Sequence, residues 1–305
     1  MGKVSVSKIE YKGWANCVQI SNGIVDMIVT TDVGPRIIRY GFVEKQNMFY
    51  EDASTLGKTG GDGWNTYGGH RLWHSPEDKL RSYENDNFPI ESWSKIENGI
   101  SVVQGIEPNT RMKKEFNITL SDDSPEVMII HRITNKSMWE VELAAWSISV
   151  MAPGGVEIIP DVLKETGLLP NRMISLWDYT KMGDSRVTWG DKYIILRQDS
   201  NATSPFKIGL PNEEGWGAYI NGGNMFVKSY IHFDDAPYPD YASSYETYTN
   251  SSMIEIETLS PLCLLAPEEF VEHIDEWSLF ANVAVPPNEA EIDEKILPLI
   301  KSMLE

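Results

Sequence analysis

Two histidines, an arginine, a tryptophan and two carboxylates crowd into residues 68–78, Gly-Gly-His-Arg-Leu-Trp-His-Ser-Pro-Glu-Asp. The two glycines let the backbone turn or approach a ligand closely, and the proline opposes a helix. Titratable groups on irregular backbone are typical of a ligand-binding loop. The alternative is a polar loop whose tryptophan fills the core. The side chains that we expect to face a ligand are His70, Arg71, Trp73 and His74.

A second candidate is a pair of glutamates two residues apart in residues 253–261, Met-Ile-Glu-Ile-Glu-Thr-Leu-Ser-Pro. In a strand, Glu255 and Glu257 share one face and the isoleucines share the other. Two adjacent carboxylates repel each other, which raises the pKa of at least one toward the range of a general base. The alternative is a solvent-facing strand with ordinary charges. Glu246, in the tyrosine-rich stretch before this strand, competes for the same role.

An arginine, an amide and aromatic rings gather between residues 168 and 186. Sugars are bound by such mixtures, because arginine, asparagine and carboxylates hold adjacent hydroxyls while an aromatic ring covers the apolar face of the sugar. An Arg–Asp pair that pins a loop beneath core aromatics is an equal alternative. The side chains expected to line a sugar cleft here are Asn171, Arg172, Trp177 and Asp184.

Metal and cofactor motifs are not expected. His70 and His74 have the spacing of a metal-binding pair only on a helix, which the flanking glycine and proline oppose, and no third ligand is obvious. The sequence contains no GxSxG elbow, phosphate-binding glycine loop or dinucleotide fingerprint. We therefore expect a protein that works without a metal ion or a cofactor.

The composition excludes several classes of partner. The chain has 305 residues, 41% hydrophobic, with ten tryptophans and a formal net charge of −19. That charge argues against nucleic acid and anionic membranes, and it disfavours acidic substrates such as uronates or sugar phosphates. Cations near the binding site could still allow an acidic substrate. The candidates are Arg36, Arg71, Arg172, Arg186 and Lys228.

The expected compartment is the cytoplasm. Two cysteines are too few for a disulfide framework and indicate a reducing environment. Residues 1–7 lack the apolar region of a signal peptide, and no apolar run is long enough to span a bilayer.

Short strand-like runs separated by turn residues fill most of the chain, and a long glycine-rich loop is expected over residues 57–69. Only residues 289–305 have a helical pattern, and a kink is expected at Pro298. More than ten short strands and a terminal helix predict one all-β domain over residues 1–305, a large antiparallel sandwich. The expected strands include residues 14–20, 24–30, 36–42, 99–106, 113–120, 126–135, 140–150, 192–197, 206–209, 217–221, 224–230, 252–258 and 270–279.

Over nearly its whole length the chain resembles the galactose mutarotase-like (aldose 1-epimerase-like) superfamily, and most closely a branch that carries a domain of unknown function. The motifs that carry the resemblance are Val-Gly-Pro-Arg-Ile-Ile at 33–38, Gly-Gly-His at 68–70, Tyr-Thr-Asn at 248–250, Glu-Thr at 257–258 and the stretch 266–277.

The resemblance implies an antiparallel β-supersandwich that binds a sugar in its concave face. In mutarotases a glutamate takes the proton of the anomeric hydroxyl and a histidine protonates the ring oxygen. By resemblance, Glu257 is the base and His70 a substrate ligand. The strand that carries the acid histidine in mutarotases matches residues 144–148, which contain no histidine; Trp146 is the best match. The acid would then be His70, His74 or a tyrosine.

We therefore expect a carbohydrate-binding protein that interconverts anomers or epimers of a free sugar, with Glu257 and His70 as the catalytic pair. A sugar-binding module without chemistry is the main alternative. Glycoside cleavage is a third, and it needs a second carboxylate across the cleft, from Glu77, Asp184 or Glu246. The full set expected to contact the small-molecule carbohydrate is Arg36, Arg71, Trp73, His74, Asn171, Arg172, Trp177, Asp184, Lys228 and Glu246.

Overall fold

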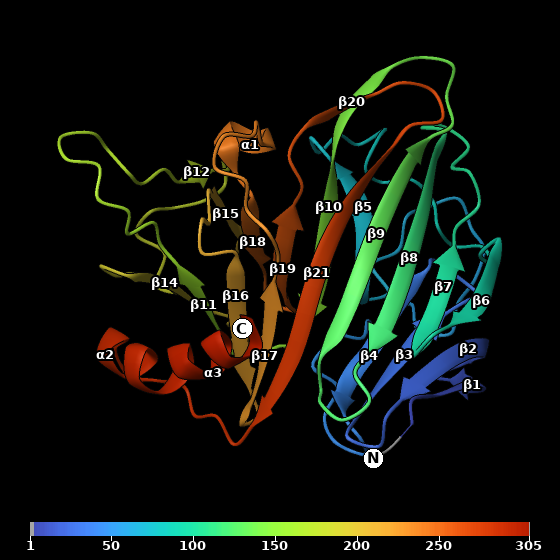
Figure 1. The fold of residues 1–305 in the computed structure, drawn as a ribbon, viewed down its shortest axis with the longest axis horizontal. Coiled ribbons are helices and arrows are strands. Elements are labelled where there is room, and N and C mark those ends of the chain that lie inside the picture. Colours follow the sequence, from blue (N-terminus) through green and yellow to red (C-terminus); the bar gives the residue numbers. More distant parts are fainter. Residues whose placement is uncertain (1–2, 305) are drawn as a thin grey trace.

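Two large antiparallel sheets lie face to face in the computed structural model, which describes residues 3–304 (Figure 1). Residues 1, 2 and 305 lie outside this description; they include the start of the segment considered for a signal peptide and the end of the predicted terminal helix. None of the helices in residues 3–304 has the length and apolar character needed to cross a membrane.

The first sheet has eleven strands in the described residues. Their spatial order is β1 (Ser5–Tyr11), β2 (Trp14–Ser21), β3 (Val25–Thr30), β4 (Arg36–Phe42), β5 (Gly69–Ser75), β10 (Val141–Met151), β19 (Ile254–Leu259), β18 (Tyr245–Thr249), β15 (Phe206–Leu210) and β12 (Ser175–Leu176), with β20 (Cys263–Leu265) paired to β10.

The second sheet has ten strands in the same part of the chain. Their order is β13 (Val187–Trp189), β14 (Tyr193–Arg197), β11 (Val156–Pro160), β16 (Trp216–Asn221), β17 (Asn224–Ser229), β21 (Phe270–Ala281), β9 (Val127–Asn135), β8 (Met112–Leu120), β7 (Gly99–Val103) and β6 (Ser92–Ile96). The predicted all-β antiparallel sandwich is confirmed.

Alternation of side chains explains why these segments pair as a sandwich. Along β8 every second residue is buried, including Phe116 and Ile118, because successive side chains of a strand point to opposite faces. The apolar faces of the two sheets meet around a cluster of aromatic rings. Trp277 lies 5.8 Å from Tyr40 of the first sheet and 5.5 Å from Phe226 of the second, measured between ring centroids. Each fully buried ring contributes about 2–3 kcal/mol.

Residues 68–78 were expected to form a loop, but most of this stretch is a buried strand in the structure. Residues 69–75 form β5, which pairs with β4 and β10 near the middle of the first sheet. Every residue of β5 is buried, so its sequence lacks the alternation that marks a half-exposed strand. Gly69 has φ +68°, and a Cβ there would lie 2.4 Å from the carbonyl oxygen of Ile37. The glycine therefore allows the close approach of β4, rather than that of a ligand.

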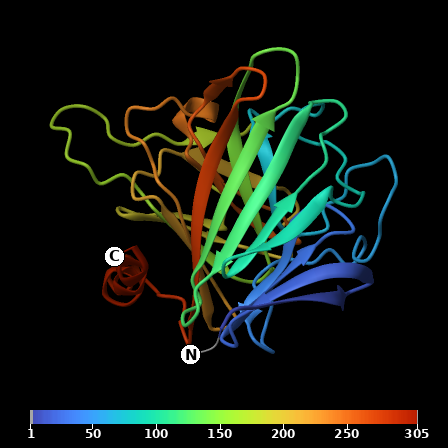
Figure 2. The same ribbon diagram turned by 45° about the vertical axis from the view of Figure 1, so that its right-hand side comes forward.

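The C-terminal segment is helical but irregular. It comprises α2 (Glu289–Glu291), a π-helical turn η1 (Ile292–Ile296) and α3 (Leu297–Leu304), and it lies beside the sandwich (Figure 2). Ile292, Ile296 and Ile300 are buried against the second sheet. The predicted helix is confirmed, with the π turn just before Pro298, whose missing N–H cannot complete a regular α-helical ladder. The short element α1 (Pro239–Ala242) has positive φ at three residues and is a left-handed turn.

Candidate functional site

A pocket of about 430 Å³ lies on the face of the first sheet that points away from the second sheet. Its floor spans five neighbouring strands, β5, β10, β19, β18 and β15. These strands contribute Arg71 and Trp73, Trp146, Glu255, Tyr248 and Lys207 respectively. The surrounding loops add Trp64, Thr66, Glu77, Tyr83, Trp177, Tyr179, Pro205, Asn250 and Met253.

Strand register brings charged side chains from distant parts of the sequence into one row. Arg71 is opposite Ile148, Ile148 is opposite Glu257, and Glu257 is opposite Glu246. Residues paired in this way on adjacent strands project from the same face. Two glutamates directly opposite each other are unfavourable alone, so a cation must lie nearby.

That cation is Lys207. Its Nζ lies 2.8 Å from Glu246 and 3.1 Å from Glu257, and it is 4.6 Å from the ring centroid of Trp146 and 4.7 Å from that of Trp177. Burial lowers the pKa of Lys207, but the two carboxylates outweigh it and hold that pKa well above its ordinary value. The ammonium is therefore charged, and both carboxylates and both rings stabilise it.

Glu257 lies behind the lining of the pocket rather than in it. Its Oε2 accepts hydrogen bonds from Trp146 Nε1 at 2.8 Å and from Lys207 Nζ at 3.1 Å, while its Oε1 is buried without a partner. Burial raises the pKa of Glu257. Burial also raises the pKa of Glu246 well above its ordinary value; nearby Glu257 adds to this effect and Lys207 opposes it. The two carboxylates and the lysine form one coupled group.

Arg71, like Lys207, is a cation held by a carboxylate and two aromatic rings. Its Nη2 lies 3.0 Å from Glu255 Oε1, and its guanidinium lies 4.4 Å from the ring centroid of Trp73 and 5.6 Å from that of Trp64. Its Nε and Nη1 are buried without hydrogen-bond partners. Each cation of the floor thus has a carboxylate partner and two aromatic rings.

The loop that carries Trp177 and Tyr179 over the pocket is fixed to β15. The hydroxyl of Thr180 donates to the carbonyl oxygen of Lys207 at 2.6 Å and accepts from its N–H at 3.0 Å. Lys207 therefore holds this wall of the pocket through its backbone and through its cation–π contact with Trp177.

The opposite wall consists of aromatic rings packed edge to face. Tyr83 lies 5.4 Å from Trp64 and 4.7 Å from Trp73 between ring centroids, and its hydroxyl donates to Glu77 at 2.6 Å. Arg36 supports this wall from behind: it pairs with Asp86 and donates to the carbonyl oxygens of residues 65 and 66, and its side chain does not line the pocket.

Several solved structures share this architecture, although no protein-family model and no curated protein matches the chain. A galactose mutarotase-like protein from Clostridium acetobutylicum aligns with a TM-score of 0.55 and 11% identity, over 92% of this chain and 99% of that one. A galactose mutarotase-like protein from Lactobacillus casei gives 0.53 and 9%, over 87% and 100%. A galactose mutarotase related enzyme from Lactobacillus acidophilus gives 0.54 and 10%, over 88% and 98%. This chain has the galactose mutarotase-like fold. At these identities the likeness extends to the fold alone.

On this galactose mutarotase-like fold, His70 and His74 face the space between the sheets rather than the pocket, because they alternate with Arg71 and Trp73 along β5. His131 Nδ1 donates to a backbone carbonyl, so its Nε2 accepts from His70 Nε2 at 2.7 Å. Ser149 then donates to His70 Nδ1. Burial lowers the pKa of both His70 and His131, the latter to about 4, so both rings are neutral.

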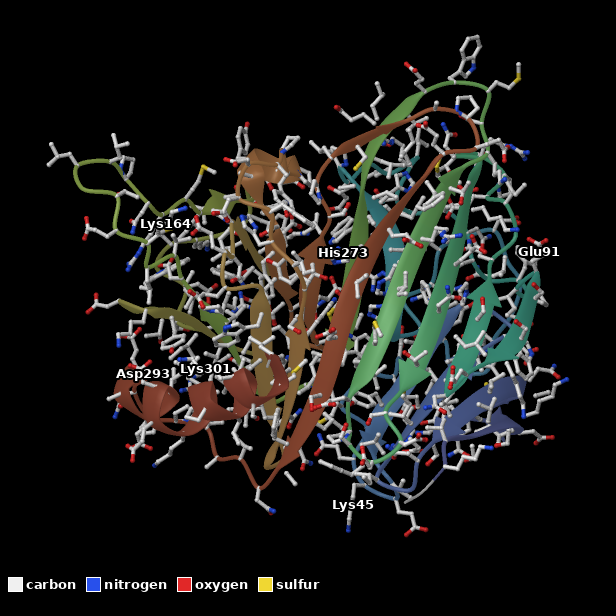
Figure 3. The ribbon with its side chains drawn as sticks, in the orientation of Figure 1. Lys45, Glu91, Lys164, His273, Asp293 and Lys301 are labelled. Atoms are coloured by element: carbon white, nitrogen blue, oxygen red, sulfur yellow. The ribbon has the colours of Figure 1, made fainter. Side chains whose placement is uncertain are left out.

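Lys228 lies in the same interior network. Its Nζ is 3.3 Å from Asp275, which also accepts from the hydroxyls of Ser147 and Thr258 and contacts His273 midway along β21 (Figure 3). Ligand atoms of His70, His131 and Asp275 lie within 4.8 Å of one another, a spacing open to a metal ion. However, Lys228 already neutralises Asp275 and the two rings bond to each other. The contacts fit a structural network that joins the sheets.

Three residues predicted to line the cleft lie elsewhere. Asn171 donates to the carbonyl oxygen of residue 164, Arg172 pairs with Asp161 at 3.3 Å, and Asp184 pairs with Arg186 at 2.9 Å. The alternative of an Arg–Asp pair that pins a loop therefore applies to Asp184. The pocket itself contains Arg71, Trp73 and Trp177 of the predicted set, with Glu246 and Glu257 behind its floor.

The residues expected to contact a sugar did not include Lys207 or the rings of Trp64, Tyr83 and Tyr179, all of which line the pocket. A signal for Lys207 exists, because it lies between Phe206 and Ile208 in a predicted strand, and alternation places it opposite the core. The loop aromatics carry no comparable signal, since their direction depends on the fold.

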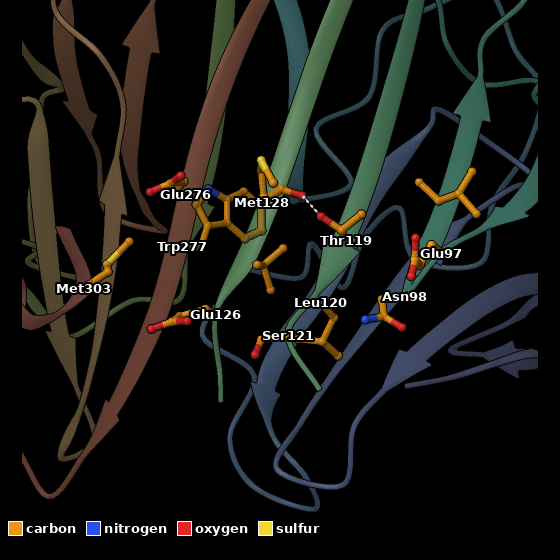
Figure 4. Close-up of a pocket in the computed structure, with 12 residues that line it drawn as sticks. Glu97, Asn98, Thr119, Leu120, Ser121, Glu126, Met128, Glu276, Trp277 and Met303 are labelled. Atoms are coloured by element: carbon orange, nitrogen blue, oxygen red, sulfur yellow. Dashed lines mark hydrogen bonds between the residues drawn. The ribbon is translucent and has the colours of Figure 1, made fainter. Parts of the chain in front are cut away.

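A larger cavity of about 650 Å³ lies on the outer face of the second sheet (Figure 4). Its edge carries Glu97, Glu126 and Glu276, while Met128 and Met303 supply apolar surface. Trp277 also lines this cavity, although its side chain is buried in the core. The lining lacks the combination of charged pairs and several aromatic rings found in the smaller pocket.

Proposed function

We propose that this protein binds a sugar in the pocket over β5, β10, β19, β18 and β15. One observation carries the proposal: these strands place Trp73, Trp146 and Tyr248 beside Arg71, Lys207 and Glu255 on one face. Aromatic faces cover the C–H surface of a sugar ring, while charged and amide groups bind its hydroxyls. The volume of about 430 Å³ is within the usual range for small-molecule sites.

The galactose mutarotase-like fold supports this proposal as an analogy only, because one fold hosts many functions. The test is ligand-observed NMR with a panel of free aldoses and amino sugars in both the gluco and the galacto configuration. Saturable binding accompanied by a change in tryptophan fluorescence is expected, since four tryptophans line the pocket. Absence of binding across the panel would refute a sugar site.

Interconversion of anomers, with Glu257 as the base, is a second candidate. The favouring observation is a buried carboxylate with a raised pKa and an oxygen, Oε1, that has no partner. Against it, Trp146 and Lys207 separate Glu257 from the open pocket, and none of the five histidines lines it. The groups that remain to protonate a ring oxygen are Lys207 and tyrosines such as Tyr179, whose pKa values are raised, so they are weak acids.

If the protein is an epimerase, Glu257→Gln abolishes its acceleration of anomer exchange and leaves sugar affinity within about tenfold, because a general base acts on the transition state. NMR of freshly dissolved α-anomers measures both quantities in one sample. Binding without acceleration in the unaltered protein would leave the binding module as the function. An active Glu257→Gln variant would remove Glu257 from the role of base.

A further inference from the structure

The pocket and the residues directly behind its floor contain more carboxylates than cations. Arg71 is paired with Glu255 at 3.0 Å, and Lys207 is shared by Glu246 and Glu257. Burial and the neighbouring Glu257 raise the pKa of Glu246, and Lys207 is the one cation that these two carboxylates share. Each resident cation is thus already paired in charge with at least one carboxylate.

Glu77 is the carboxylate of the lining without a cationic partner. It lies on the exposed segment that follows β5, and no lysine, arginine or histidine in residues 3–304 lies within ion-pair distance of it. Its hydrogen-bond partner is the hydroxyl of Tyr83 at 2.6 Å, which does not neutralise its charge. The pocket therefore carries a surplus negative charge at this wall.

The surplus charge lies beside aromatic faces. Tyr83, which binds Glu77, packs at 4.7 Å against Trp73 and at 5.4 Å against Trp64, measured between ring centroids. A carboxylate beside tryptophan and tyrosine rings is the environment that favours an ammonium group, through charge attraction and through the negative faces of the rings. The same floor already holds two cations in this manner, Arg71 and Lys207.

We propose that the pocket selects amino sugars, with the ammonium group beside Glu77 and the ring of Tyr83. This inference rests on the proposed sugar-binding function and specifies its ligand class. Uncharged sugars of the same shape bind more weakly because they leave Glu77 unpaired. Acidic sugars bind most weakly because they meet the unpaired negative charge of Glu77.

The experiment compares matched sugars by NMR titration at about pH 6 and low ionic strength, where charge effects are largest. Glucosamine, glucose, N-acetylglucosamine and glucuronate share one ring and differ in charge, and the galacto series repeats the comparison. Because Glu77 is exposed to solvent, we expect glucosamine or galactosamine to bind about two- to fivefold more tightly than the parent sugar. N-acetylation, which removes the charge, should abolish the advantage.

The variant Glu77→Gln keeps the acceptor for Tyr83 but removes the charge. We expect the ratio of amino-sugar to parent-sugar affinity to fall to near one. Glu97→Gln, at the turn between β6 and β7 on the second sheet, is the matched control and should leave the ratio unchanged. In the unaltered protein the ratio should also shrink as salt is added, a readout that does not depend on the folding of a variant.

The outcomes separate the two proposals. Equal affinity for charged and parent sugars, or tightest binding of the acidic sugar, would overturn the amino-sugar inference and leave the sugar site intact. An amino-sugar advantage that survives Glu77→Gln and high salt would overturn the role of Glu77. No binding of any sugar in either series would overturn the proposed function and this inference together.

Discussion

Removal of Lys207 is the sharpest perturbation of the candidate site. In Lys207→Met the apolar stem is retained, while Glu246 and Glu257 remain directly opposed across β18 and β19 with no cation between them. Both side chains of this carboxylate pair are at most 1% exposed, so water cannot replace the ammonium. Loss of one partner from a buried ionic group costs about 3–5 kcal/mol of unfolding free energy, a large fraction of typical protein stability.

The pH dependence of this loss follows from the carboxylates. Without Lys207 the pKa values of both glutamates rise further in the folded state, while those of the unfolded chain stay ordinary. A group with a raised folded pKa stabilises the protein below its unfolded pKa and loses that contribution as the pH rises toward the folded pKa. The Lys207→Met variant should therefore be less impaired at about pH 5 than at about pH 7.5.

Urea unfolding followed by tryptophan fluorescence at several pH values measures both the loss of unfolding free energy and its dependence on pH. Lys164→Met is the matched control, because Lys164 (Figure 3) pairs with Asp234 of another loop, and their side chains are 58% and 59% exposed. This control should unfold like the unaltered protein. Adding Glu246→Gln to Lys207→Met should recover part of the stability, since one of the opposed charges is removed. A loss in Lys207→Met below about 1 kcal/mol, or a loss independent of pH, would refute the coupling of Lys207 to the two glutamates.

Two further predictions concern the wall of the pocket and the interior. Trp177→Ala should weaken sugar binding about three- to tenfold by NMR titration, because the variant loses a ring face and the contact with Lys207. Trp139→Ala is the control and should bind sugar normally, because Trp139 is 75% exposed in the turn that connects β9 to β10. Glu157 is buried and accepts from Tyr245 and Thr247, and burial raises its pKa to about 8. Between the ordinary pKa and about 8 the folded state holds a proton that the unfolded state has lost, so this group lowers unfolding free energy by roughly 1.4 kcal/mol per pH unit as the pH rises. Glu157→Gln should flatten that slope in urea unfolding at several pH values, and an unchanged slope would contradict it.

Local chemistry determined much of this protein. Runs with period-two alternation, separated by glycine, proline and asparagine turns, can bury one face only by pairing as sheets, so an antiparallel sandwich followed from the sequence. The same alternation placed Glu255 and Glu257 on one face of β19. The terminal helix followed from its apolar spacing, which buries Ile292, Ile296 and Ile300.

The tertiary structure decided which of the reactive residues meet. The histidines of β5 looked like ligands because a strand buried on both faces shows no alternation, and only its neighbours show that His70 points inward while Arg71 points to the pocket. Lys207 and Glu257 are fifty residues apart in sequence and 3.1 Å apart in space. Such contacts depend on strand order and register, which are set by the packing of the whole sandwich. No local pattern encodes them, because the free energy that selects them is shared among all the strands.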